Sequence, residues 1–366
     1  MTTQLCHHDC RYILYDYLQF AGGAERLSLT LTSGFPEYHL VVSRVFPEAA
    51  VLTTINSLPV LCIGNSITAM LGRIPEAIWC FRHSANFLRN AEVVLYSGFY
   101  APLAVENQRS GRKVYYCHTP PRYLYDLSES YKQCVSPLLL PVFDTGLNWL
   151  RSEYERALWQ MDRVIANSVN VQKRLKKFIG IESEVIFPPV DVDRFRWLGE
   201  GEYFISLARL SRSKRVDVII RAFLQMPDKK LVVLSGGQEM DALRKLAGDA
   251  KNIHFTGWQS EAEIQQWIGN ACAAIYLPID EDFGMSPVEA MAAGKPVIGV
   301  AEGGLLETIV NGETGWLLES PPSVDMLIDT VRQLDRDTVL AMRHACEARA
   351  KLFSREIFLE KMKAVL

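Results

Sequence analysis

The chain has 366 residues, of which 49% are hydrophobic and 22% are charged, as in an average soluble globular protein. It contains 39 lysines and arginines against 42 acidic residues, and this net charge of −3 argues against a protein that binds nucleic acid polymers. The length exceeds the size that one hydrophobic core usually reaches, so we expect two domains.

Short apolar strands alternate with helical segments along most of the chain. In the first half, strands are expected at 11–15, 40–45, 93–97, 113–118 and 163–167, and a helix at 169–178. In the second half, strands are expected at 203–208, 230–235, 252–256, 273–277, 296–300 and 315–318. Helical segments between these later strands are expected at 216–224, 240–247, 261–268, 287–293 and 305–310. This alternation is typical of parallel sheets that are covered by helices on both faces.

The predicted fold is therefore α/β, with two doubly wound Rossmann-like domains that face each other across a cleft. Consecutive prolines at 188 and 189 interrupt regular structure and mark the seam. We expect an N-terminal domain at 1–187, a linker at 188–200, a C-terminal domain at 201–350 and a final helix at 351–366 that packs back toward the N-terminal domain.

The eight cysteines are scattered and form no C-x-x-C pair, a pattern that favours reduced thiols in a cytosolic protein. Residues 6–10, C-H-H-D-C, could hold a soft metal ion, but no second ligand cluster lies nearby and we expect no metal site. Neither a signal peptide nor an apolar run long enough to span a membrane is expected.

The segment from Glu281 to Glu289, E-D-F-G-M-S-P-V-E, is the strongest candidate site. It follows an expected strand and opens an expected helix. Gly284 frees the backbone, Ser286 is a candidate N-cap and Pro287 suits a first helical turn. Amides at such a helix start bind anions, and carboxylates accept hydrogen bonds from hydroxyl groups.

The spacing E-x-F-G-x-x-x-x-E, followed by A-A-G-K-P-V-I at 292–298, resembles the retaining glycosyltransferases of family 4. These enzymes have the two-domain glycosyltransferase-B (GT-B) fold. The segment A-R-L at 208–210 with Lys214, and G-G at 303–304 with Glu307, match further family segments in the same order. The resemblance implies a hexosyltransferase that uses a nucleotide diphosphate sugar, binds it in the C-terminal domain and binds the acceptor in the N-terminal domain.

The resemblance also assigns roles to individual residues. The implied catalytic residues are Glu281, His118, Arg209 and Lys214. The implied donor-binding residues are Gly22, Gly23, Arg209, Lys214, Asp282, Phe283, Gly284, Met285, Ser286 and Glu289. Physical chemistry supports the roles of Arg209 and Lys214, because a guanidinium and an ammonium can stabilise the charge of a diphosphate leaving group.

The segment H-T-P-P-R-Y at 118–123 resembles family members that transfer mannose or related 6-deoxyhexoses from GDP-sugars. The resemblance implies that His118 faces the transferred sugar and bonds to one of its hydroxyl groups. We therefore expect GDP-mannose as donor, then a GDP-deoxyhexose, then a UDP-sugar. The implied acceptor is a glycan or a polyprenyl-diphosphate-linked glycan in the assembly of bacterial surface polysaccharide such as O-antigen.

Arg215 and the D-V-D segment at 191–193 need separate interpretation. Arg215 stands where the family usually has glycine, and it could contact phosphate or remain a solvated charge. Residues 191–193, D-V-D, mimic a metal-binding D-x-D motif but lie in the expected linker, so we interpret them as structural. Because Arg209, Lys214 and helix termini supply positive charge, no metal or other cofactor is expected.

A membrane contact is a further hypothesis. Residues 67–90 have apolar side chains at helical spacing and three arginines against one acid, and residues 173–177 form a small basic cluster. A basic amphipathic helix can lie on an anionic membrane, although a core-facing helix with a solvated basic side is the simpler interpretation. We expect a cytoplasmic protein, with contact to the inner face of the membrane as an added possibility.

Two other functional classes remain open from the sequence. A nucleotide-sugar epimerase can share this architecture and would act without an acceptor. A non-catalytic glycosyltransferase-like subunit is also conceivable, but such a chain should have lost Arg209, Lys214 or Glu281, and all three are present.

Overall fold

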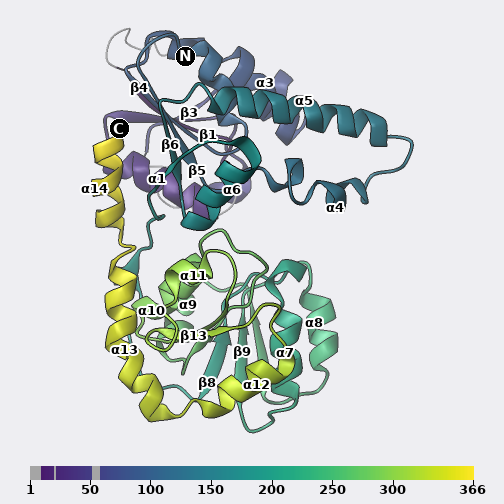
Figure 1. The fold of residues 1–366 in the computed structure, drawn as a ribbon, viewed down its shortest axis with the longest axis vertical. Coiled ribbons are helices and arrows are strands. Elements are labelled where there is room, and N and C mark those ends of the chain that lie inside the picture. The colour runs from purple at the N-terminus through teal and green to yellow at the C-terminus, as the bar shows by residue number, and fades with distance from the viewer. Residues whose placement is uncertain (1–9, 20–21, 52–57) are drawn as a thin grey trace. The chain divides into compact units, whose positions relative to one another are not determined.

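The computed structural model describes residues 10–19, 22–51 and 58–366. The chain forms two compact units, one of residues 1–187 with 359–366 and one of residues 188–358. Each unit is built around one sheet, and helices cover the sheet (Figure 1).

The first unit contains a seven-stranded sheet in the order β3-β2-β1-β4-β5-β6-β7, and the described strand pairs are all parallel. The order reverses between β1 and β4, which creates the switch point at which such sheets bind ligands. Its strands are β1 (Arg11–Tyr15), β2 (Tyr38–Val42), β3 (Val60–Cys62), β4 (Val93–Ser97), β5 (Arg112–Cys117), β6 (Arg163–Ala166) and β7 (Glu184–Val185). Its α-helices are α1 (Gly23–Gly34), α2 (Ser66–Ala69), α3 (Arg73–His83), α4 (Ser128–Lys132), α5 (Leu140–Leu158) and α6 (Val169–Ile179).

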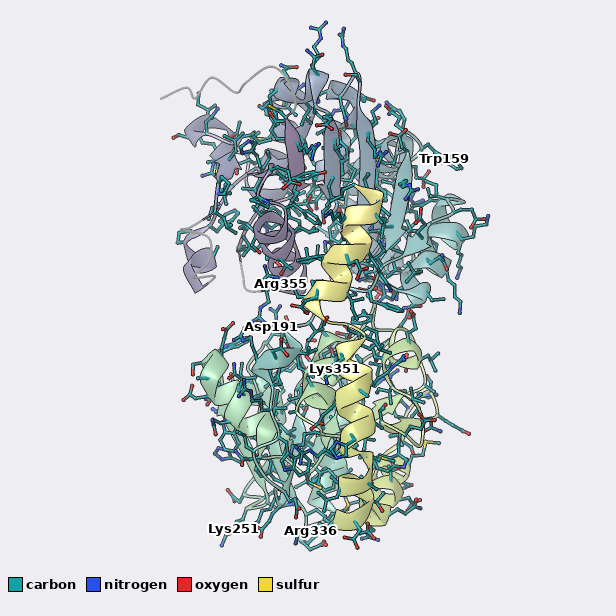
Figure 2. All side chains as sticks on the ribbon, turned by 90° about the vertical axis from the view of Figure 1, so that its left-hand side faces the viewer. Trp159, Asp191, Lys251, Arg336, Lys351 and Arg355 are labelled. Carbon is teal, nitrogen blue, oxygen red and sulfur yellow. The ribbon has the colours of Figure 1, made fainter. Side chains whose placement is uncertain are left out.

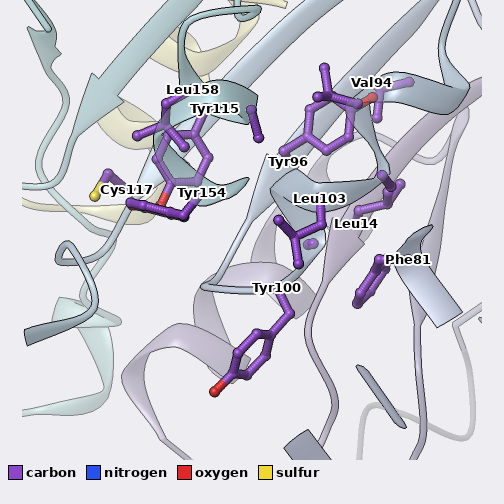
Figure 3. Packing of buried hydrophobic residues seen from close by; sticks show 14 of the residues in the cluster. Leu14, Phe81, Val94, Tyr96, Tyr100, Leu103, Tyr115, Cys117, Tyr154 and Leu158 are labelled. Carbon is purple, nitrogen blue, oxygen red and sulfur yellow. The ribbon is translucent and has the colours of Figure 1, made fainter. Parts of the chain in front are cut away.

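Large aromatic side chains fill the core of the first unit (Figure 3). Tyr96, Tyr115 and Tyr154 are fully buried. Their hydroxyl groups nevertheless have partners, because Tyr115 and Tyr154 bond to each other at 2.8 Å and Tyr96 donates to Gln108 Oε1 at 2.8 Å. These bonds satisfy polar atoms that burial would otherwise penalise.

The second unit contains a six-stranded sheet in the order β10-β9-β8-β11-β12-β13, again with parallel pairs throughout the described strands. Here the order reverses between β8 and β11. Its strands are β8 (Tyr203–Ser206), β9 (Lys230–Leu234), β10 (Ile253–Gly257), β11 (Ala274–Ile275), β12 (Val297–Val300) and β13 (Gly315–Leu318). Its α-helices are α7 (Val216–Leu224), α8 (Met240–Ala247), α9 (Glu261–Gly269), α10 (Met285–Ala292), α11 (Leu305–Thr308), α12 (Val324–Gln333) and α13 (Arg336–Lys351).

A buried lysine attaches the segment after the double proline to the second unit. Lys295 is fully buried, and its Nζ lies 3.4 Å from the ring centroid of Trp197 and donates to the carbonyl oxygen of Gly199 at 2.6 Å. Burial lowers the pKa of Lys295 to about 8. The lysine of the A-A-G-K-P-V-I segment therefore has a structural role.

The final helix, α14 (Arg355–Val365), follows α13 after a three-residue turn, and Figure 2 labels Lys351 and Arg355 at this join. Phe358 and Met362 of α14 are buried. The last eight residues pack with the first unit, where Arg112 donates to the carbonyl oxygen of Leu366 at 3.2 Å.

Two basic segments differ from their expected form, while membrane contact through them stays a prediction. Residues 67–90 do not form one helix, because Gly72 has a φ of +84° between α2 and α3 and a 3₁₀ turn, Asn86–Asn90, follows α3. Residues 173–177 do not form one exposed cluster either. Arg174 is buried and donates to Thr119 Oγ1 at 3.1 Å, because it lies on the core-facing side of α6.

Long helix α5 was absent from the sequence prediction, and so were α12 and α13. The expected strand at 273–277 is shortened to β11. Among the described helices, none combines the length and the apolar character that a membrane span requires.

Candidate functional site

Three side chains from two strand ends meet in the second unit. Lys214 follows β8, and Tyr276 and Glu281 follow β11, so all three lie at the switch point of the sheet. Lys214 Nζ donates to Tyr276 Oη at 3.0 Å and forms an ion pair with Glu281, while Tyr276 Oη donates to Glu281 Oε2 at 3.1 Å. Lys214 and Glu281 are 21% and 19% exposed, so the pair can still reach a ligand.

Tyr276 is the member of this group that the sequence did not identify. Its side chain is 5% exposed, and burial together with the neighbouring Glu281 raises its pKa, so the hydroxyl stays protonated. The signal was weak, because a tyrosine at the end of an apolar strand is usually a core residue.

Arg209 lies at the carboxyl end of β8, three residues beyond Ser206. Its side chain is exposed, and the described part of the chain gives its guanidinium neither a hydrogen bond nor an ion pair. A guanidinium in this position can bind an anion through its planar donor fork.

The loop that carries Glu281 rests on two glycines. The amide of Gly304 donates to the carbonyl oxygen of Glu281 at 2.7 Å. A Cβ atom at Gly303, whose φ is +59°, would lie 2.4 Å from that same oxygen. The G-G pair therefore lets the two loops approach backbone to backbone.

Arg215 supports the same loop from the other side. It has a φ of +49°, an unusual left-handed conformation for a residue other than glycine. Its Nη1 forms an ion pair with Glu302 and donates to the carbonyl oxygen of Pro278 at 3.3 Å, and Glu302 Oε2 accepts the amide of Asp280 at 3.0 Å. Arg215 and Glu302 are 16% and 17% exposed, so Arg215 is not a solvated charge, and its guanidinium pairs with the carboxylate of Glu302.

The helix after this loop begins earlier than the sequence predicted. Gly284, with a φ of +92°, is the N-cap of α10, and Ser286 is the second helical residue. The prediction that Ser286 caps the helix was wrong, because the left-handed glycine already turns the chain. Asp282, Met285 and Ser286 are half-buried around the start of α10. Phe283 is buried against Phe353, with ring centroids 5.3 Å apart. Glu289 contributes to the raised pKa of Tyr276.

An exposed tryptophan lies at the carboxyl end of the neighbouring strands. Trp258 directly follows β10 and is 71% exposed. A Cβ atom added at Gly236, which lies just after β9, would be 2.6 Å from Trp258 Nε1, so the indole covers this glycine. Trp258 was not among the residues predicted from the sequence, although a tryptophan in a short segment after a strand was a usable signal.

His118 lies in the first unit, directly after β5, and therefore not in the same unit as Lys214 and Glu281. It forms a 2.8 Å hydrogen bond through Nε2 with Ser97 Oγ, and the rings of Tyr15 and Tyr116 surround it. Burial lowers the pKa of His118 to about 4, so the imidazole is neutral near pH 7.

Gly22 and Gly23 open α1 at the same carboxyl edge of the first sheet. Gly22 is the N-cap, and no side chain caps the helix there. A Cβ atom at Gly22 would lie 2.4 Å from Glu25 Oε2. Burial raises the pKa of Glu25, whose carboxylate bonds to Tyr15.

The low pKa of His118 predicts how the free energy of unfolding depends on pH. Because its pKa is about 4 in the folded protein and about 6.5 in the unfolded chain, the unfolded state binds the proton more readily. We expect the free energy of unfolding to lose about 2–3 kcal/mol from this residue as pH falls from 7.5 to 4.5. Urea unfolding of wild type and His118→Gln across this range isolates the contribution. An imidazole pKa of 6.5 or higher in an NMR titration contradicts the prediction.

No group of three or more histidine, cysteine or acidic side chains that could hold a metal ion occurs among residues 10–19, 22–51 and 58–366. Residues 6–9 of the C-H-H-D-C run lie outside the described part. In the D-V-D segment, Asp191 Oδ2 lies 3.6 Å from Arg194 Nε. Independence from metal ions stays a prediction.

The second unit matches a family of known proteins. Residues 191–353 match the model of the glycosyl transferases group 1, and this range contains Arg209, Lys214, Tyr276 and Glu281. The second unit is therefore a glycosyl transferases group 1 domain. The matched range begins just after the double proline, so the donor-site motifs lie inside it and His118, Gly22 and Gly23 lie outside it.

Individual relatives of this glycosyltransferase are distant. The alpha-1,3/1,6-mannosyltransferase ALG2 of Mus musculus is 24% identical in an alignment that covers 82% of each chain. A GDP-mannose-dependent alpha-(1-6)-phosphatidylinositol monomannoside mannosyltransferase of Mycobacterium tuberculosis is 33% identical over 43% of this chain and 49% of its own length. Both names describe mannose transfer by those proteins.

Solved structures establish the fold over the whole chain. HepE of Anabaena, crystallised with UDP and glucose, has a TM-score of 0.76 at 18% identity, and the match covers 98% of this chain and 99% of that one. The predicted fold class, two doubly wound α/β units of the GT-B type, is confirmed.

Proposed function

We propose that this glycosyltransferase moves a hexose, mannose first among the candidates, from a nucleotide diphosphate sugar to a glycan or polyprenyl-diphosphate-linked acceptor with retention of configuration. GDP-mannose is the favoured donor. The Lys214–Tyr276–Glu281 group, together with the exposed Arg209 after the same strand β8, is the observation that carries the proposal. The mannosyltransferase names of distant relatives support the choice of sugar.

The order of these residues along the second sheet supports an orientation of the donor, with its sugar, diphosphate and base lying along the carboxyl ends of the strands. Glu281 follows β11, Arg209 and Lys214 follow β8, and Trp258 follows β10. We place the sugar at Glu281, the diphosphate at Arg209 and Lys214, and the nucleotide base over the indole of Trp258. Glu289 would bind the ribose, and the amides at the start of α10 would lie near the sugar hydroxyls and the diphosphate. Carboxylates suit hydroxyl donors, cations suit phosphate, and an exposed indole suits stacking of a base.

The chemical step follows from these placements. The acceptor hydroxyl attacks the anomeric carbon on the face from which the nucleoside diphosphate leaves, and its proton passes to the departing phosphate oxygen. Arg209 and Lys214 stabilise the charge that develops on this phosphate as the sugar–oxygen bond breaks. Glu281 orients the sugar, and Lys214 and Tyr276 hold its carboxylate in place.

In the first unit, neutral His118 is suited to a hydrogen bond with a sugar hydroxyl. Ser97 already holds one ring nitrogen, which fixes the orientation of the imidazole. We assign this unit to the acceptor, and Gly22 and Gly23 to an approach of backbone amides to the donor diphosphate. The low pKa of His118 argues against a role as a cation.

A donor panel tests the proposal. With GDP-, UDP- and TDP-sugars at equal concentration, we expect GDP-mannose to give the highest kcat/KM, at least about tenfold above a UDP-hexose. Trp258→Ala should raise the KM for the preferred donor roughly tenfold, because one stacking contact is lost. Trp159→Ala, in the first unit, is the matched control. Preference for a UDP-sugar would overturn the donor assignment, and conversion of the donor sugar without any acceptor would indicate an epimerase.

A further inference from the structure

Large apolar side chains are unusually exposed along α2, the turn after it and α3. Ile67 is 78% exposed, Met70 85%, Leu71 50%, Ile74 41% and Trp79 50%. Single exposed apolar residues are common on protein surfaces, but five within thirteen positions form a contiguous patch of the kind that marks an interaction site.

The beginning of α5 continues this patch. Leu138 is 87% exposed, Leu139 59%, Val142 73% and Trp149 44%. Val142 and Trp149 are seven residues apart, so they lie on the same side of the helix. Within residues 133–150 the sole charged residue is Asp144, and it is paired with Lys132 at 2.7 Å.

Contacts between α3 and α5 join the two parts. The guanidinium of Arg82 lies 5.3 Å from the ring centroid of Trp149 and forms an ion pair with Glu153. A groove of about 560 Å³ between the helices is lined by Leu71, Pro75, Ile78, Trp79, Arg82, His83 and Trp149. We call the nine exposed apolar residues on both sides of this groove the apolar face.

The charges around α2 and α3 are of one sign. Arg73 and Arg89 are exposed. The one acid of this segment, Glu76, is 2% exposed and its carboxylate is held by Arg44 and Thr68. The segment therefore presents aliphatic side chains, a tryptophan and cations, and no exposed carboxylate.

We propose that the apolar face docks on an anionic lipid bilayer. Aliphatic side chains enter the acyl boundary, Trp79 and Trp149 lie at the interface, where one edge of the indole stays hydrated, and Arg73 and Arg89 meet the lipid phosphates. A second copy of the chain fits less well, because a symmetric contact between two such faces would bring Arg73 and Arg89 against a surface whose carboxylate, Asp144, is already paired with Lys132. The inference does not depend on which donor or acceptor the enzyme uses.

Co-sedimentation with vesicles tests this surface. At low salt we expect the full chain to bind vesicles of equal phosphatidylglycerol and phosphatidylcholine, and to bind pure phosphatidylcholine at least about tenfold more weakly. The double variant Met70→Ser/Leu138→Ser should reduce binding to the anionic vesicles by about tenfold or more. Arg73→Gln/Arg89→Gln should reduce it roughly tenfold, because each cation near the surface contributes to the attraction.

Matched controls lie in the same unit and outside the apolar face. Trp159→Ala removes a side chain that is 64% exposed, and Arg109→Gln removes an exposed arginine (Trp159 is labelled in Figure 2). Neither should change vesicle binding. The proposal is overturned if wild type stays in the supernatant with anionic vesicles at low salt, or if the controls lose as much binding as the face variants. It is also overturned if sedimentation shows a dimer that Met70→Ser/Leu138→Ser dissociates, since the face is then an interface between copies.

Discussion

Replacing Lys214 with methionine or Glu281 with glutamine is expected to lower kcat for transfer by about 10²–10³-fold. Methionine keeps the length of the lysine stem without its charge, and glutamine keeps the shape of glutamate without its carboxylate. Lys214 contacts both Tyr276 and Glu281. Lys214→Met removes the positive charge that would stabilise the leaving phosphate, and Glu281→Gln removes the negative charge that would bind the sugar hydroxyls. Rate measurements at saturating donor and acceptor provide the test.

The two variants should also be strongly non-additive, because each removes the partner of the other. The double variant Lys214→Met/Glu281→Gln is expected to be about as slow as either single variant. Lys230→Met serves as a control, since Lys230 pairs with Glu202 at 2.7 Å in the same unit but both side chains are mostly exposed. Its kcat should remain at the wild-type value. Near-wild-type turnover in both single variants, with folding confirmed by circular dichroism, would refute the assigned site.

Replacing Glu302 with alanine is expected to reduce the free energy of unfolding by about 3–5 kcal/mol and to lower kcat as well. The substitution removes the carboxylate that pairs with the Arg215 guanidinium, which is 16% exposed, and that accepts the Asp280 amide. Since Asp280 directly precedes Glu281, the loop that positions Glu281 should lose its support. Urea unfolding and steady-state kinetics measure the two effects.

Variants at Arg215 separate the backbone contribution from the side-chain contribution. Arg215→Gly and Arg215→Ala both remove the ion pair, but glycine accepts a φ of +49° without strain. We expect Arg215→Gly to be more stable than Arg215→Ala by about 1 kcal/mol, with both less stable than wild type. If Arg215→Gly equals or exceeds wild type in both stability and kcat, then the ion pair does not support the loop.

Some helices and strands have the predicted bounds, which shows where local sequence information was sufficient to predict secondary structure. β1, β4, β13, α7 and α8 begin and end at the predicted residues, because apolar runs and helical periods are read from neighbours along the chain. By contrast, α5 was missed. Its exposed apolar side chains, such as Val142, do not produce the alternation of buried and polar positions by which an amphipathic helix is predicted.

The sequence by itself determined the α/β class, the two doubly wound units and the resemblance of the second unit to a glycosyltransferase family, because strand–helix alternation and the E-x-F-G-x-x-x-x-E spacing are local properties. Only the tertiary structure decided which side chains meet. Tyr276 joins Lys214 across 62 positions, and Arg215 joins Glu302 across 87, because the order of strands in the sheet brings these loops together. The same folding buried Arg174 and left Met70 and Leu138 exposed, since burial depends on what packs against a residue and not on its neighbours in the chain.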